Sequence, residues 1–257
     1  MLQLLICSDV HTYINNIMLA AGKLDHVDAI LIAGDIEEER DRLLEALDGT
    51  PVLTICGNCD YYLNSDYPQE LLIDISEHTF SSGSTVPAAD VPAASVQAAS
   101  VTAADVSNTR LCIDQTPHIE HVRELSYGTV PERLASLPPY IQKYMPKGLL
   151  SRMACDKRDP RIMHRILMTH GKEYEVPDLS LLAARAALWD ADIIIFGHTH
   201  KYLQEKRQGG KYLFLNPGCL VGDPKAQIRS WGQYEICSFV SLTISPGGEV
   251  NAEHFYI

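Results

Sequence analysis

Short runs of apolar residues recur along the chain, and most of them end in a loop that contains glycine or a polar side chain. Runs of this length, rich in β-branched residues, are typical of strands buried on both faces. The runs that predict buried strands are 2–7, 28–33, 51–56, 71–75, 165–169, 191–196 and 211–215. Residues 235–244 and 249–256, separated by Ser245-Pro246-Gly247-Gly248, predict a hairpin.

Three segments between these runs have apolar residues at helical spacing. Thr12 is the expected N-cap of the first helix, Glu37–Glu39 open the second, and Pro177-Asp178 begin the third. Their expected apolar positions are Ile14, Ile17, Met18 and Ala21; Leu43, Leu44 and Leu47; and Leu179, Leu182, Ala183, Ala186 and Ala187. Alternating strands and helices predict a parallel sheet, and the consecutive strands of the second half suggest a second sheet stacked on it.

The middle of the chain differs in composition. Residues 86–105 repeat a five-residue unit (VPAAD, VPAAS, VQAAS, VTAAD), whose period fits neither a helix nor a strand. We expect a solvated, disordered linker there, with a partner-docking segment as the alternative. Residues 137–145 have helical spacing between prolines. They predict a short amphipathic helix that either packs on the main body or serves as a lid or oligomer contact.

Composition narrows the function classes. A chain of 257 residues suffices for one large domain, and 21 Lys and Arg against 33 Asp and Glu give a formal charge of −12. This charge argues against non-specific nucleic-acid binding, although bound divalent cations can still attract phosphate substrates. The first apolar run has no basic flank and no run is long enough to span a membrane, so neither a signal peptide nor a membrane anchor is expected. The seven scattered cysteines predict free thiols and a cytoplasmic location.

The most informative stretch is the run 191–196 with Gly197-His198-Thr199-His200 directly after it. Glycine permits a sharp turn, and both histidines can point to one spot above the end of the strand, where open α/β sheets place their sites. Alone, such a motif is more often a polar turn. However, other predicted strands also end in potential metal ligands: Asp9 and His11, Gly34-Asp35, Gly57-Asn58, and His170-Gly171. Each of these has an ordinary capping or turn role available, but together they predict a metal site.

This ordered set of motifs resembles the calcineurin-like metallophosphoesterase superfamily. Within it, the chain is similar to small bacterial and archaeal phosphodiesterases of the YfcE type, whose third motif commonly reads GNCD, as in Gly57-Asn58-Cys59-Asp60. The resemblance covers roughly residues 1–75 and 165–257 of a single domain (1–257), with an insertion at about 76–162 between them. It implies an α/β fold, a four-layer α/β/β/α sandwich of two mixed β-sheets flanked by helices.

The resemblance also implies two divalent metal ions and a phosphodiesterase activity, in which a metal-bridging hydroxide attacks phosphorus in line. The implied ligands are Asp9, His11 and His200 for one ion, Asn58, His170 and His198 for the other, and Asp35 as the bridge. Oxygen and nitrogen donors of this kind suit Mn²⁺, the expected metal, as well as Fe, Co, Ni or Zn²⁺. The expected catalytic residues are Asn58, Asp60 and His170.

Position 59 departs from the superfamily pattern. Many members have a histidine there that protonates the leaving group, so Cys59 predicts a preference for diesters with acidic leaving groups. Cys56 and Cys59 also match a C-x-x-C redox motif, but no second C-x-x-C accompanies them. The expected substrate is a small phosphodiester or nucleotide, and a homo-oligomer is compatible with the sequence. The alternatives are a phosphomonoesterase or nucleotidase, and a catalytically silent scaffold with the same fold.

Overall fold

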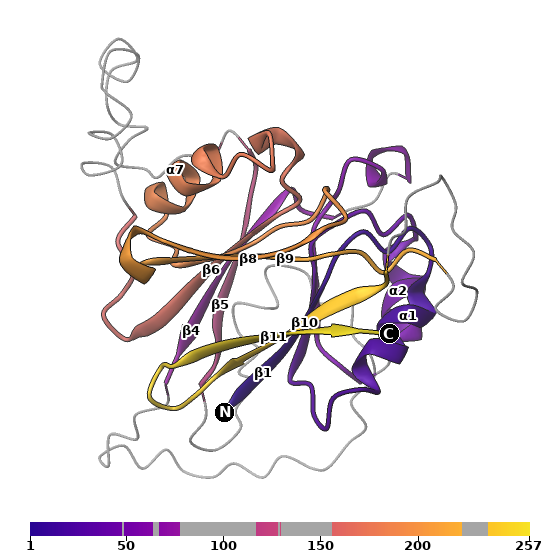
Figure 1. Cartoon of the computed structure of the whole chain (residues 1–257), viewed down its shortest axis with the longest axis horizontal. Helices are drawn as coiled ribbons and strands as arrows, with labels where there is room; N and C mark the ends of the chain where they lie inside the picture. Colours follow the sequence, from indigo (N-terminus) through magenta and orange to yellow (C-terminus); the bar gives the residue numbers. More distant parts are fainter. Residues whose placement is uncertain (48, 64–66, 78–116, 128, 130–155, 223–235) are drawn as a thin grey trace, which may run out of the picture.

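The computed structural model (Figure 1) describes residues 1–47, 49–63, 67–77, 117–127, 129, 156–222 and 236–257. The repeat at 86–105 and the helix expected at 137–145 lie outside these residues. The helices are α1 (Ile14–Ala21), α2 (Arg40–Ala46) and α7 (Ser180–Leu188), with 3-10 turns at Asp60–Leu63, Lys172–Tyr174 and Gln208–Gly210. The strands are β1 (Leu2–Cys7), β2 (Ala29–Ile32), β3 (Val52–Thr54), β4 (Glu70–Ser76), β5 (His118–Leu125), β6 (Ile162–Thr169), β7 (Ile193–Ile195), β8 (Tyr202–Arg207), β9 (Tyr212–Pro217), β10 (Ser238–Ile244) and β11 (Val250–Tyr256).

The strands form two mixed sheets. The first sheet has five strands in the order β11-β10-β1-β2-β3, and the second has six in the order β5-β4-β6-β7-β9-β8. The runs β1-β2-β3 and β6-β7-β9 are parallel, and the remaining pairs are antiparallel. The predicted hairpin is present as β10 and β11. It joins the first sheet beside β1, however, while β4 joins the second, so the sheets do not divide the chain into halves.

Three apolar cores separate four layers. Strand side chains such as Leu4, Leu31, Ile73 and Ile195 are fully buried between the two sheets. A second core places α1 and α2 on the outer face of the first sheet, and a third places α7 on the outer face of the second. Figure 1 shows these helices at opposite sides of the paired sheets. The predicted four-layer sandwich is therefore confirmed.

The first helix differs from its prediction in its cap and in its buried face. Tyr13 is the N-cap and no side chain caps the helix, and the backbone N–H of Thr12 donates to the Ile36 carbonyl oxygen. Met18 is 50% exposed, whereas Asn16 and Ile17 are buried. The Asn16 amide donates to two backbone carbonyl oxygens of the 220–222 loop, so this polar residue faces inward and Met18 turns to solvent.

Two strands that the apolar pattern does not reveal, β5 and β8, lie at the two edges of the second sheet. In β8, every second residue is exposed, and its sequence YLQEKR is largely polar. Polar and charged side chains are usual on edge strands, where they discourage pairing with other chains. An edge strand such as β8 therefore lacks the apolar run that is typical of the central strands.

A half-buried histidine, His164, connects the two sheets on the side where β6 begins. His164 Nδ1 lies 2.8 Å from the Asp192 carboxylate, and its Nε2 lies 2.8 Å from the Gly248 carbonyl oxygen in the β10–β11 turn. Burial lowers the pKa of His164, but the hydrogen bond and charge of Asp192 outweigh it, so the pKa is raised above its usual value. Among the described residues, no helix is long and apolar enough to cross a membrane.

Candidate metal centre

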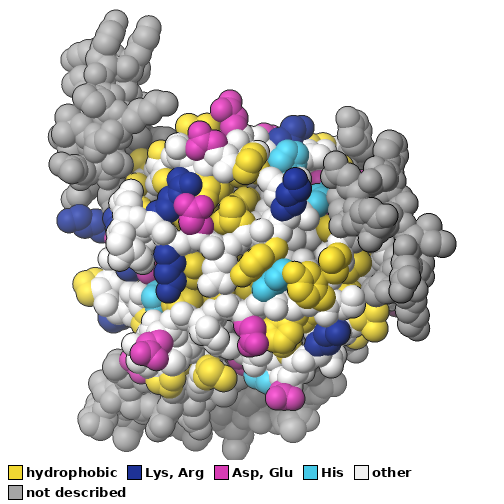
Figure 2. Space-filling view, viewed as in Figure 1, with side chains coloured by type: hydrophobic (Ala, Val, Ile, Leu, Met, Phe, Trp, Pro, Cys, Tyr) yellow, Lys and Arg dark blue, Asp and Glu magenta, His cyan; other side chains and the backbone are white. Residues whose placement is uncertain are grey.

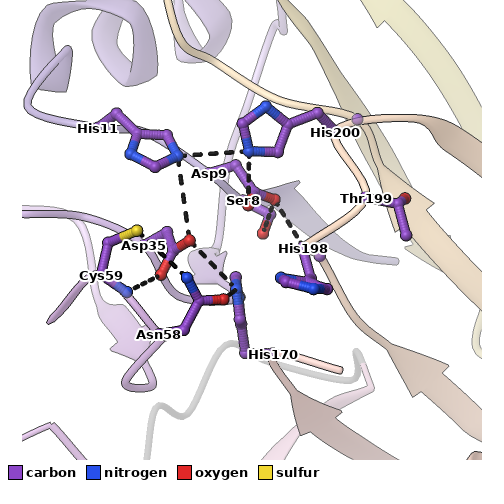
Figure 3. Close-up of polar contacts among 12 residues, drawn as sticks. Ser8, Asp9, His11, Asp35, Asn58, Cys59, His170, His198, Thr199 and His200 are labelled. Atoms are coloured by element: carbon purple, nitrogen blue, oxygen red, sulfur yellow. Dashed lines mark hydrogen bonds and ion pairs between the residues drawn. The ribbon is translucent and has the colours of Figure 1, made fainter. Parts of the chain in front are cut away.

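The C-terminal ends of β1, β2 and β3 in the first sheet meet those of β6 and β7 in the second (Figure 3). Parallel strands deliver their outgoing loops to one edge of a sheet, and two stacked sheets place two such sets of loops face to face. The side chains brought together here are Asp9, His11, Asp35, Asn58, His170, His198 and His200. These are the seven ligand positions that the sequence predicts.

Two glycines allow the loops to approach this closely. A Cβ atom on Gly57 would lie 2.1 Å from Asp35 Oδ1, and one on Gly197 would lie 1.8 Å from Ser8 Oγ. Both distances are well below van der Waals contact, so any other residue would push the ligand loops apart. The glycines of the G-N and G-H-x-H motifs are thus required by packing at the site itself.

Backbone strain is concentrated in the same loops. Many non-glycine residues with a left-handed backbone belong to them: Asp9, His11, Thr12, Asp35, Glu37, His198 and His200, with φ between 45° and 71°. Such conformations are costly for residues with a Cβ atom, and they persist where the surrounding structure imposes them, often at functional sites. In these loops, Asp9 and His11 point to the site while Val10 between them is buried in the core beneath α1 and α2.

The first group of donor atoms consists of Asp9, His11 and His200. His200 Nε2 lies 3.3 Å from His11 Nε2 and 3.2 Å from Asp9 Oδ1. The other carboxylate oxygen of Asp9 accepts hydrogen bonds from Ser8 Oγ and from the backbone N–H of His198, which hold the carboxylate in place. Asp9 is fully buried, and its Oδ1 has no hydrogen-bond partner.

The second group is centred on His170. Its Nδ1 lies 2.8 Å from the Ala33 carbonyl oxygen, so this nitrogen carries a proton. Its Nε2 then faces two acceptors, Asn58 Oδ1 at 3.1 Å and Asp35 Oδ2 at 3.2 Å. His198 lies beside it, with its ring centroid 5.3 Å from that of His170.

Asp35 lies between the two groups. Its Oδ2 is 3.2 Å from His170 Nε2 and 4.0 Å from His11 Nε2. Burial opposes its charge, but hydrogen bonds from His170 and the Cys59 N–H, with the charge of His11, lower its pKa to about 2. Burial also lowers the pKa of His170, yet Asp35 and Asp9 outweigh it and raise that pKa. The centre of the site thus has a field that favours positive charge.

The spacing of these donor atoms fits bound metal ions. Ligand atoms at about 2.1 Å from one ion stand about 3.0–3.4 Å from each other. The contacts among Asp9, His11 and His200 are 3.2–3.3 Å, and those of His170 with Asn58 and Asp35 are 3.1–3.2 Å. The Nε2 atoms of His11 and His200 face each other, and Asp9 Oδ1 beside them is buried without a hydrogen bond. A divalent cation between them would give the buried Asp9 oxygen and the facing imidazole nitrogens a common partner.

Asp60 belongs to neither donor group, and its carboxylate bonds the backbone of the loops that carry them. Asp60 is fully buried, and its carboxylate accepts the backbone N–H groups of Ile36, Glu37 and Gly57 at 2.7–2.9 Å. It therefore joins the loop of Asp35 to the loop of Asn58. Cys59 lies at the rim, where burial and the negative charges of Asp35 and Glu37 raise its pKa to about 12.

Three residues that the motifs do not include also shape the site. Ser8 supports Asp9, as described above, and Glu37 Oε1 lies 3.3 Å from His11 Nδ1. Asn216, fully buried at the end of β9, donates to the Gly197 carbonyl oxygen at 2.7 Å and fixes the turn that carries His198 and His200. Ser8 and Glu37 adjoin ligand motifs in the sequence, whereas the sequence marks Asn216 only as part of the turn Asn216-Pro217-Gly218.

Comparison with known proteins identifies the family. The model of the calcineurin-like phosphoesterase superfamily domain matches residues 2–108 and 151–238, which is more than half of the chain. The chain belongs to this superfamily. The resemblance inferred from the strand-end motifs is thereby confirmed, and the chain is a phosphoesterase-superfamily protein with residue clusters able to hold divalent metals. No curated protein matches it.

Solved structures with a similar fold have low sequence identity to this calcineurin-like chain. A predicted phosphoesterase from Streptococcus pneumoniae is 17% identical, with a TM-score of 0.46 and coverage of 100% of this chain and 98% of that chain. An archaeal phosphodiesterase is 13% identical (TM-score 0.44, 99% and 100% covered), and vacuolar protein sorting 29 from Cryptosporidium parvum is 14% identical (TM-score 0.48, 100% and 97% covered). At TM-scores below 0.5, these similarities carry no argument about activity.

Proposed function

We propose that this protein is a dinuclear metal-dependent phosphodiesterase. The observation that carries the proposal is the presence of two adjoining donor groups, each spaced as the ligands of one ion, with Asp35 between them. Asp9, His11 and His200 would hold one ion, and Asn58, His170 and His198 the other. Two-metal hydrolases hold their ions roughly 3.5–4 Å apart, and a shared carboxylate offsets part of their repulsion.

The chain's own residues would bind and orient the reacting groups. When bound, the two ions supply Lewis acidity, which acidifies a water and neutralises charge on phosphoryl oxygens. The Ala33 carbonyl fixes the His170 ring so that its Nε2 faces the site. His198 is only partly buried beside it, so its ring can contact a phosphoryl oxygen. Groups that are already oriented need no reorganisation during the reaction, which is the main source of electrostatic catalysis.

Position 59 bears on the substrate class. The Cys59 side chain stands beside Glu37 and Asp35, where many relatives have an imidazole. Without that imidazole, a leaving group that departs without a proton is favoured, and an aryl oxide is such a group. General-acid assistance is typically worth about 10²–10⁴-fold, so its absence should separate aryl from alkyl diesters by a comparable factor.

The charge of the protein supports a small substrate. The formal net charge is −12, and Figure 2 shows Lys and Arg side chains scattered singly among acidic ones on this face of the described residues. A nucleic-acid backbone is bound mainly by clustered basic side chains. A small phosphodiester needs only the metal ions and the few polar groups around them.

The test compares a diester with a monoester on the same protein. Purified protein reconstituted with Mn²⁺ is assayed with bis-p-nitrophenyl phosphate and with p-nitrophenyl phosphate. We expect metal-dependent hydrolysis that is faster on the diester and lost in Asp35→Ala, but retained in Asp25→Ala, which removes an exposed carboxylate. Faster hydrolysis of the monoester would instead indicate a phosphomonoesterase, and no hydrolysis of either would indicate a silent scaffold.

A further inference from the structure

Glu37 is a carboxylate beside the site for which the strand-end motifs give no role. Its Oε1 lies 3.3 Å from Nδ1 of His11, on the side of the ring opposite the donor group. Nε2 of the same ring faces His200 Nε2 at 3.3 Å and Asp35 Oδ2 at 4.0 Å, as Figure 3 shows. The two nitrogens of His11 therefore have different surroundings, a carboxylate on one side and the predicted metal ligands on the other.

The backbone holds Glu37 and His11 in a fixed relation. Three successive N–H groups of the 10–12 loop donate to carbonyl oxygens of the 35–36 loop at 2.8–2.9 Å. The N–H of Glu37 itself donates to Asp60 Oδ1 at 2.7 Å, and its φ of 55° is in the left-handed region. These contacts bring the Glu37 backbone beside the 10–12 loop, and its carboxylate, on a side chain that is 36% exposed, lies 3.3 Å from His11 Nδ1.

We propose that Glu37 is a positioning residue of the metal centre: its carboxylate accepts the Nδ1–H of His11 and so selects the tautomer whose unprotonated Nε2 faces Asp9 and His200. A neutral imidazole has one N–H and one lone pair, so the group that accepts the N–H decides which nitrogen can bind a metal. Carboxylates and backbone carbonyls commonly have this role behind metal-ligating histidines. The inference rests on the proposed function, because His11 is taken as a ligand of the first ion.

The other half of the centre has the same arrangement with a different acceptor. There the Ala33 carbonyl oxygen lies 2.8 Å from Nδ1 of His170 and leaves Nε2 toward Asn58 and Asp35. Each donor group thus contains one ring whose outer nitrogen lies within 3.3 Å of an oxygen acceptor. Glu37 differs from Ala33 in its charge, and a hydrogen bond to a charged acceptor is stronger than one to a neutral carbonyl.

A different assignment is a further metal site, because atoms of His11, Glu37 and Cys59 lie within 4.8 Å of one another. That assignment requires both nitrogens of His11 to bind metal at once, so the ring would have to lose both N–H protons. A positioning role requires only the ordinary neutral ring. The geometry therefore favours Glu37 as the hydrogen-bond partner of His11.

The test is a Mn²⁺ titration by calorimetry on the full chain. Loss of a carboxylate behind a metal-bound histidine typically costs 10–100-fold in metal affinity. We expect Glu37→Ala to weaken one Mn²⁺ binding event by about 10–100-fold and to leave the other nearly unchanged, whereas Glu37→Gln, which retains an acceptor oxygen, loses less. Glu39→Ala is the matched control, because Glu39 is exposed and its removal changes the net charge equally. Affinities equal to those of Glu39→Ala at both events would overturn the proposal.

A second readout needs no metal. Nitrogen NMR of the His11 ring in metal-free protein should show a protonated Nδ1 in the wild type and a shift toward protonated Nε2 in Glu37→Ala. An Nε2–H ring in the wild type would contradict the inference, whatever the calorimetry shows. If the wild type bound no Mn²⁺, the proposed function would fail, while this spectrum would still decide the role of Glu37.

Discussion

The Asp60 carboxylate should be a main source of stability in the loops that form the site. It is fully buried and accepts three backbone N–H groups, those of Ile36, Glu37 and Gly57, at 2.7–2.9 Å. In Asp60→Asn, the amide oxygen can still serve Ile36 and Glu37, but the NH₂ group then faces the N–H of Gly57. One hydrogen bond to a charged acceptor is lost, which costs about 1.5–3 kcal/mol.

This loss can be measured by urea unfolding of the metal-free protein. With an m-value of about 3 kcal/mol per molar urea, the midpoint should fall by roughly 0.5–1 M. Asp25→Asn is the matched control, because Asp25 is exposed and a surface change of this kind usually stays within about 0.5 kcal/mol. Equal midpoints for the two variants would refute the argument that Asp60 holds the loops together.

Three further outcomes follow from the site and the fold. Asp35→Ala should reduce Mn²⁺ occupancy at both positions, whereas His200→Ala should weaken mainly the one shared with Asp9, as measured by elemental analysis. Cys59→Ala should change aryl-diester turnover by less than about tenfold, which is well short of the loss expected when a general acid is removed. A large loss of turnover confined to alkyl diesters would instead show that the thiol protonates the leaving group. The pKa of His164 is raised in the folded state, so its contribution to stability is complete below about pH 6.5 and is lost as pH rises through the raised pKa. In urea unfolding, the stability advantage of the wild type over His164→Gln should therefore shrink from pH 6 to pH 9.

Much of the site can be predicted from the sequence because of how parallel sheets are built. An apolar run that ends in Asp35 or His170 indicates both a buried strand and a polar side chain at its C-terminal end. Strands that run in parallel deliver those ends to the same edge, so spatial proximity follows from topology. For this reason, the candidate ligand positions can be named before any contact is known.

The remaining features depend on contacts between distant segments. The inward face of α1 is set by the bonds of Asn16 to the 220–222 loop, about 200 residues away, so periodicity alone selects Met18 wrongly. The hairpin of β10 and β11 could pair with either sheet. Its place in the first sheet follows from the antiparallel pairing of β10 with β1, which is distant in the sequence. Glu37 appears in the sequence as one of three consecutive acids before a helix, and its distinction lies in its strained backbone and its distance to His11.

The central claim is tested most directly by the number of Mn²⁺ ions that the wild-type protein binds. Folded protein is stripped of metal, equilibrated with Mn²⁺ by dialysis, and measured by elemental analysis against protein concentration. Two donor groups that share Asp35 predict two ions per chain. A well-folded protein that retains no Mn²⁺ would contradict the account.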